Sequence, residues 1–116
     1  MTKDVCGWSD YVVDENGSVY RKKDGVALKQ YIQKSGYVSV YLKDSNGWIS
    51  AVPVHRIVAK AFLPFIQGKP FVDHINTNRS DNRICNLRWA SPKDNANNEQ
   101  TKLNRKRRLI KTLTAL

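Results

Sequence analysis

The sequence has few cysteines, no acidic excess and no long apolar run. Its 116 residues include two cysteines, Cys6 and Cys85, which stand far apart and outside any Cys-x-x-Cys pair. Such spacing provides neither a disulfide framework nor a four-ligand zinc site. No stretch approaches the roughly 20 apolar residues of a membrane helix, and the start lacks a signal-peptide core. We therefore expect a reduced, cytoplasmic protein with no membrane partner and no structural zinc.

The charge is strongly one-sided. Twenty Lys and Arg residues stand against ten Asp and Glu residues, a formal net charge of +10, which favours a polyanionic partner such as nucleic acid. The excess is concentrated in residues 101–116, where the basic residues are Lys102, Arg105, Lys106, Arg107, Arg108 and Lys111. We interpret this basic tail as a phosphate-binding segment that is helical when bound to DNA. The alternative interpretation is a solubilising tail.

The first half of the chain predicts a small antiparallel sheet of three to five strands. Short β-prone segments alternate with turn signals, of which Asn46-Gly47 is the strongest hairpin signal. Between residues 36 and 43, polar and apolar residues alternate, which places Val38, Val40 and Leu42 on one face. This apolar face is expected to pack against the core.

The other face of the predicted sheet is expected to contact DNA. Six aromatic and basic residues make up this face: Arg21, Lys29, Lys34, Tyr37, Tyr41 and Lys43. Aromatic side chains among cations suit contacts to sugars and bases, and a two-stranded ribbon fits a major groove. The alternative is structural, because tyrosine is a good strand former and exposed lysine protects sheet edges.

The second half predicts a helix, two short strands and a second helix, so the fold class is α+β. Residues 54–63 repeat apolar side chains at helical spacing, which predicts a short helix that covers the sheet. Residues 71–74 and 86–90 predict strands on either side of a polar, turn-rich segment. Ser91-Pro92 is typical of a helix start.

A hairpin of the two predicted strands, packed on the second helix, can bring polar residues from three places in the sequence close together. Asp73 and His74 end the first strand, Asn86 begins the second, and Asn95 lies on the helix. Carboxylate and amide oxygens can hold a hard cation such as Mg²⁺, which offsets charge that develops on a phosphate. A neutral imidazole can take the proton from an attacking water. These residue types predict metal-assisted hydrolysis.

The segments VHRIVAKAF and VDHINTNRSDNRICNLRWASPKDNANN resemble the HNH homing-type endonucleases of phages and mobile introns. The close resemblance covers about residues 54–98, and residues 8–52 are more loosely similar to the β-rich DNA-contacting module often found before that unit. The resemblance implies a ββα-metal fold, double-stranded DNA as partner and one Mg²⁺ or Mn²⁺ per site. It also implies a phage or mobile-element origin, hence the cytoplasm of a bacterial host.

The resemblance assigns a role to each matching residue. His74 would be the general base, and Asp73 and Asn95 would be the metal ligands. Asn86 would brace the hairpin loop and orient the histidine. Arg88 would contact the phosphate near the cleaved bond.

Other interpretations of the same residues remain open. Asp73 and Asn86 could be turn residues with no catalytic role. Asn97 or Asn98 could be the helical metal ligand in place of Asn95. Successive strand residues face opposite sides. Asp73 and His74 can therefore serve one site only if the strand ends or twists there.

The other singled-out residues are interpreted as structural. His55 is expected to be buried and hydrogen-bonded, and Trp8, Trp48 and Trp89 are expected to fill the core. Some HNH proteins carry four zinc-binding cysteines, which this chain lacks. Its hairpin must instead be held by the packing of Val72, Ile75, Ile84, Leu87 and Trp89.

We therefore predict three segments. Residues 1–53 form the β-rich module, 54–100 the HNH unit and 101–116 the basic tail. The predicted function is a divalent-metal-dependent DNA endonuclease that nicks one strand per active site. Cutting both strands would need a homodimer or a second engagement. The alternative is a non-catalytic basic DNA- or RNA-binding module, which has no need of the Asp-His-Asn set.

Overall fold

The computed structural model describes residues 1–96 and residue 98. Along the chain, the elements are β1 (Thr2–Val5), β2 (Trp8–Asp14), β3 (Val19–Arg21), β4 (Tyr31–Ile32), β5 (Val38–Lys43), β6 (Ile49–Pro53), α1 (Val54–Phe62), β7 (Phe71–His74), the 3₁₀ turn η1 (Ile84–Asn86), β8 (Leu87–Ala90) and α2 (Pro92–Ala96). None of the helices in this part of the chain has the length and apolar character of a bilayer-spanning segment. The basic tail lies outside the described residues.

Residues 1–53 form two three-stranded antiparallel sheets, β1-β2-β3 and β4-β5-β6. The prediction of one sheet is therefore wrong, although the α+β class is confirmed. Leu28 donates its backbone N–H to Val19 of the first sheet at 2.8 Å, whereas Tyr31 and Ile32 pair with β5 of the second. Residues 28–32, a single β-prone segment of the sequence, are thus divided between two sheets.

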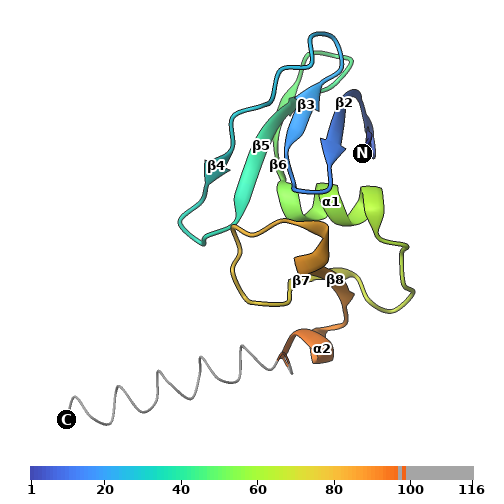
Figure 1. Cartoon of the computed structure of the whole chain (residues 1–116), viewed down its shortest axis with the longest axis vertical. Helices are drawn as coiled ribbons and strands as arrows, with labels where there is room; N and C mark the ends of the chain where they lie inside the picture. The colour runs from blue at the N-terminus through green and yellow to red at the C-terminus, as the bar shows by residue number, and fades with distance from the viewer. Residues whose placement is uncertain (97, 99–116) are drawn as a thin grey trace, which may run out of the picture.

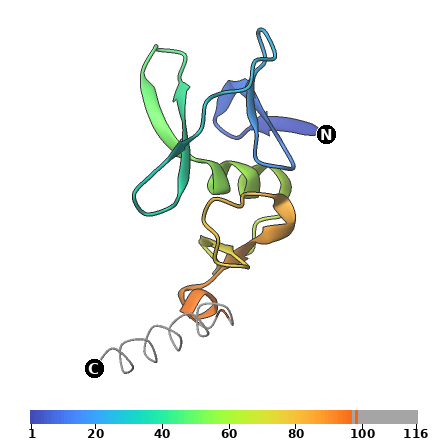
Figure 2. The same cartoon turned by 60° about the vertical axis from the view of Figure 1, so that its left-hand side comes forward.

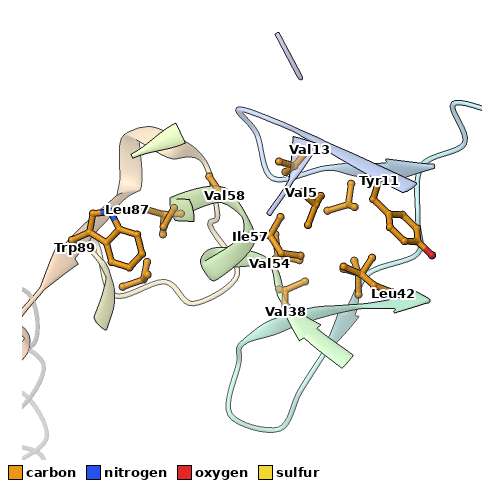
Figure 3. Close-up of a cluster of buried hydrophobic side chains, with 14 residues drawn as sticks. Val5, Tyr11, Val13, Val38, Leu42, Val54, Ile57, Val58, Leu87 and Trp89 are labelled. Atoms are coloured by element: carbon orange, nitrogen blue, oxygen red, sulfur yellow. The ribbon is translucent and has the colours of Figure 1, made fainter. Parts of the chain in front are cut away.

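Helix α1 lies between these sheets and the β7–β8 hairpin (Figures 1 and 2). It ends within one residue of its predicted bounds, and it buries Val54, Ile57, Val58 and Ala59. Its apolar residues join both halves of the described chain, because a cluster of buried side chains extends from Val5 to Trp89 (Figure 3). The division of the chain at residue 53 stays a prediction.

The alternation predicted for β5 is confirmed from Val40 to Lys43, whereas Ser39, which it places on the outward face, is buried. Val38, Val40 and Leu42 are buried, whereas Tyr41 and Lys43 are exposed. Because β5 buries one side on the core, its outward residues remain available to a ligand.

Two residues expected in the core are exposed. Trp48 is 74% exposed because it follows the tip of the β5–β6 hairpin, where its N–H bonds to Asp44 Oδ1 at 3.0 Å. Ile75 is 46% exposed because it follows the last residue of β7. Trp89 is buried as expected and donates its indole N–H to Leu63 O at 3.2 Å, while Trp8 is partly buried.

The second half of the described chain forms the predicted strand, loop, strand and helix. Strands β7 and β8 are antiparallel, and Asp73 lies opposite Arg88. Helix α2 begins where Ser91 and Asp94 cap each other. Ser91 Oγ accepts the Asp94 N–H, and Asp94 Oδ2 accepts the Ser91 N–H, both at 3.1 Å. This reciprocal cap fixes the start of α2 beside the hairpin.

Candidate functional site

His74 is the last residue of β7, and its side chain is enclosed by three other segments. The residue is 4% exposed, and its Nε2 lies 2.7 Å from Asn82 Oδ1 in the loop between the two strands. The imidazole centroid is 5.2 Å from that of His55 on α1 and 6.0 Å from the Tyr37 ring that precedes β5. The packing thus restricts the rotation of the His74 ring.

Asp73 is also buried, at 6% exposure, but its partners are different. Its Oδ2 accepts hydrogen bonds from Arg88 Nε and from Asn98 Nδ2, each at 2.9 Å. Arg88 is the cross-strand neighbour of Asp73, and Asn98 follows α2. The carboxylate is therefore held between β8 and the segment after α2, and shares none of these contacts with His74.

Each of these two side chains keeps a second polar atom in contact with solvent. Among the described residues, His55 Nδ1 is the buried side-chain nitrogen or oxygen that lacks a hydrogen-bond partner. His74 Nδ1 and Asp73 Oδ1 also accept no hydrogen bond from the described residues. Neither of them is among the buried atoms without a partner, so both are accessible to solvent. A base and a cation ligand both need such an open atom.

Asn86 closes the loop between the strands. Its Oδ1 accepts the Asn76 N–H at 3.0 Å, and its Nδ2 donates to Asn76 Oδ1 and to Asp81 O, both at 2.9 Å. The hydrogen-bond partner of His74 Nε2 is Asn82 Oδ1, from a residue for which the sequence predicted no role. Asn82 stands in a run of polar turn residues, so the residue types alone gave no signal for it.

The helical ligand predicted from the sequence was Asn95. This residue lies on α2 with an exposed side chain, and within the described residues its backbone N–H bonds to Ser91 O at 3.0 Å. Asn98, one of the open alternatives, is the asparagine that contacts Asp73, and Asn97 lies outside the described residues. The ligand role of Asn95 stays a prediction.

Part of the predicted DNA-contacting face forms an exposed patch. Lys29, Lys34, Tyr41 and Lys43 are all exposed. Lys29 Nζ lies 5.2 Å from the centroid of the Tyr31 ring, which meets the Tyr41 ring edge to face at 5.0 Å. Tyr31 therefore adds a second aromatic ring to this patch, next to that of Tyr41.

Two other members of that predicted face have different surroundings. Arg21 is exposed but forms an ion pair with Asp24 at 3.1 Å. Tyr37 stacks on His55 with a centroid distance of 5.0 Å, and the Arg79 guanidinium lies 4.5 Å from the same ring. Tyr37 thus packs beside His74. The predicted tail contacts Lys102, Arg105, Lys106, Arg107 and Arg108 lie outside the described residues.

The candidate metal ligands are oxygens. Within residues 1–96 and 98, no three His, Cys, Asp or Glu side chains gather around a common point. Mg²⁺ commonly binds proteins through one or two carboxylates and completes its shell with water and substrate phosphate. One buried carboxylate with an open oxygen, next to the amide of Asn98, fits that kind of ion. Cys6 and Cys85 are unpaired and exposed.

His55 is a second histidine beside His74, and its environment keeps it neutral. Its Nδ1 is buried, and the expected hydrogen bond to that atom is absent in the described part of the chain. Burial, followed by the charges of His74 and Arg56, lowers the pKa of His55 from 6.5 to about 4. Its proton therefore does not titrate between pH 5 and 8.

The lowered pKa of His55 makes the fold acid-sensitive. The unfolded chain binds a proton here near pH 6.5 and the folded chain near pH 4, so stability is unaffected above 6.5 and falls as the pH drops towards 4. Between pH 7 and 4.5 this residue should cost about 2–3 kcal/mol of unfolding free energy.

Urea unfolding of the wild type and of His55→Phe, which keeps a ring against Tyr37, measures this cost. The wild type should lose about 2–3 kcal/mol more than the variant over that pH range. Parallel pH profiles for the two proteins would contradict the assignment.

The chain is similar in sequence to several known proteins. Residues 52–97 match the HNH endonuclease family. The DNA endonuclease I-HmuI of Bacillus phage SP01 is 36% identical over 102 residues, which are 86% of this chain and 58% of that protein. HNH endonuclease L245 of Acanthamoeba polyphaga mimivirus is 32% identical over 87 residues, 75% of this chain and 26% of that protein.

The same relationship is visible in three dimensions. A solved structure of I-HmuI, described as DNA binding and cleavage by this HNH homing endonuclease, matches with a TM-score of 0.77 and 36% identity. The match covers 88% of this chain and 59% of that one, so the chain spans less than two thirds of the length of these relatives. Residues 52–97 thus match the HNH endonuclease family, and the chain is related in sequence and fold to the phage homing endonuclease I-HmuI.

Proposed function

We propose that the chain is a divalent-metal-dependent DNA endonuclease that hydrolyses phosphodiester bonds. The observation that carries the proposal is the buried Asp73–His74 pair at the end of β7, in which Asp73 Oδ1 and His74 Nδ1 remain open. A module that only binds DNA has no use for a buried carboxylate next to a restrained imidazole. The relationship to I-HmuI supports DNA as the substrate.

Each residue of the site receives one role. His74 Nδ1 takes the proton from the attacking water, as a positioned imidazole can near neutral pH. Asp73 Oδ1 is a cation ligand, and Asn95 is the proposed second ligand from α2. Arg88 Nε lies 2.9 Å from Asp73 Oδ2. Arg88 is therefore next to the proposed cation ligand, where it would contact the phosphate that the cation holds. Asn86 keeps the loop closed.

The match to the HNH family implies a divalent cation, and we propose Mg²⁺ or Mn²⁺. Both ions prefer the carboxylate and amide oxygens that this site contains. When bound, the cation would offset the charge that develops on the phosphate and on its leaving oxygen. The protein's own contribution is to hold Asp73 with one oxygen available and the other engaged.

The DNA is proposed to lie along the exposed patch of the second sheet. Lys29, Lys34 and Lys43 provide cations, and Tyr31 and Tyr41 provide ring faces or edges. Phosphate contacts of this kind dominate affinity, whereas base contacts determine sequence preference. The tail residues 101–116 remain a predicted source of further phosphate contacts.

All of these groups come from one chain, so we propose that a single chain nicks one strand. A supercoiled plasmid incubated with the protein and Mg²⁺ or Mn²⁺ should convert to nicked circles. EDTA should stop the conversion, because the cation is part of the site. DNA that is bound tightly but never broken, with or without metal, would instead favour the non-catalytic binding module.

A further inference from the structure

The contact between His74 and Asn82 has no role in the site described so far. Asn82 is 5% exposed, and its Oδ1 lies 2.7 Å from His74 Nε2. An amide oxygen can only accept a hydrogen bond. A bond to this oxygen therefore requires the imidazole proton to be on Nε2 and leaves the lone pair on Nδ1, the nitrogen that reaches solvent.

Asn82 is held in place from outside the HNH segment. A Cβ on Gly17, in the turn between β2 and β3, would lie 3.1 Å from Asn82 Cβ and 3.1 Å from Asn82 O. Gly17 has a φ of +89°, which L side chains rarely adopt. Beside it, Glu15 O accepts the Ile84 N–H at 2.9 Å. The turn of the first sheet is thus packed against the loop that carries Asn82.

No other neighbour of His74 makes this hydrogen bond in the described part of the chain. The side-chain amide of Asn86 bonds to Asn76 and Asp81. His55 contributes a ring contact, and its own Nδ1 has no partner. Tyr37 lies with its ring centroid 6.0 Å away. These rings restrict the plane of the imidazole without choosing which nitrogen carries the proton.

We propose that Asn82, supported by the turn at residues 15–17, is a positioning residue that fixes His74 with its proton on Nε2 and its lone pair on Nδ1. The catalytic consequence rests on the proposed function, whereas the tautomer is a property of the folded protein alone. The first sheet then helps to set the tautomer of His74 through Asn82, in addition to any contact that the sheet makes with DNA.

Nitrogen-15 NMR of the imidazoles measures the tautomer directly. The chain has two histidines, so His55→Phe assigns the signals of His74 without ambiguity. In metal-free and DNA-free protein at pH 8, His74 should show a protonated Nε2 and an unprotonated Nδ1. A wild-type spectrum with the proton on Nδ1, or with an even mixture of tautomers, would overturn the proposal.

Two variants of Asn82 form a matched pair. Asn82→Leu has a similar volume but no oxygen, and should produce a tautomer mixture at His74. Asn82→Asp keeps the acceptor oxygen and should keep the proton on Nε2. An unchanged tautomer in a folded Asn82→Leu protein would show that Asn82 does not set it. If Asn82→Leu does not fold, the wild-type spectrum still decides.

Plasmid nicking separates this inference from the proposed function. Asn82→Leu should lower kcat by roughly 10- to 100-fold, as loss of a partner that fixes a histidine tautomer does, with KM unchanged. Asn82→Asp should restore part of that loss. An inactive wild type with the expected tautomer would defeat the proposed function and leave the positioning intact. An active wild type with the opposite tautomer would defeat the positioning role of Asn82 and leave the proposed function intact.

Discussion

Replacement of His74 by alanine is expected to lower the rate of plasmid nicking by about 10²- to 10⁴-fold, the usual contribution of a general base. The affinity for DNA should change little, because His74 is buried, whereas the proposed phosphate contacts are exposed lysines of the second sheet. Single-turnover nicking in Mg²⁺ measures the rate, and a filter-binding titration with EDTA present measures the affinity.

A folding defect has to be separated from a chemical one in that variant. His74 is enclosed by Asn82, His55 and Tyr37, so alanine leaves a small cavity and some loss of stability. Free imidazole added to the alanine variant should enter this cavity and recover part of the rate. A variant that nicks at the wild-type rate would remove His74 from the mechanism.

The elements that follow from a local repeat could be predicted from the sequence. The apolar stripe of α1 depends on neighbours three and four residues away, and the helix formed where the spacing placed it. The alternation along β5 is equally local, so Val38, Val40 and Leu42 are buried as expected. The cap at Ser91 is another short-range signal, and α2 starts directly after it.

The partition of the first half into two sheets could not be predicted. Whether a strand joins one sheet or another is decided by tertiary packing rather than by its own residues. Tyr37 shows the same limit. It precedes β5 in sequence, yet it stacks on His55 of α1 instead of joining the exposed face with Tyr41. Trp48 is exposed because a hairpin tip extends beyond the core.

In the site, residue type identified Asp73 and His74 as the candidate carboxylate and base, and their catalytic roles remain predictions. Their partners were harder to foresee. The contact between Asn82 and His74 depends on the course of a polar loop that has no periodic pattern. The contact of Asn98 with Asp73 depends on where the chain passes after α2. Long-range polar contacts of this kind are fixed by the finished fold and have no local sequence signal.

Asp73→Asn is the second change with a large expected effect. The amide retains one oxygen, which Arg88 and Asn98 would take because both are donors to this position. The NH₂ group would then face the place where a cation needs an oxygen. Loss of cation charge at the phosphate is worth several kcal/mol, so nicking should fall by about 10²- to 10³-fold.

The same substitution should abolish the stabilisation of the free protein by Mg²⁺. In the wild type, a cation that binds only the folded chain raises the melting temperature with concentration, and Asp73→Asn should remove that rise. Asp44→Asn is the matched control. Asp44 Oδ1 holds the β5–β6 turn through Asn46 and Trp48, so its variant has the same loss of charge at a residue outside the β7–β8 hairpin. This control should keep both the Mg²⁺ response and the nicking rate. If the two variants behave alike, the effect is one of general charge, and Asp73 does not bind the cation.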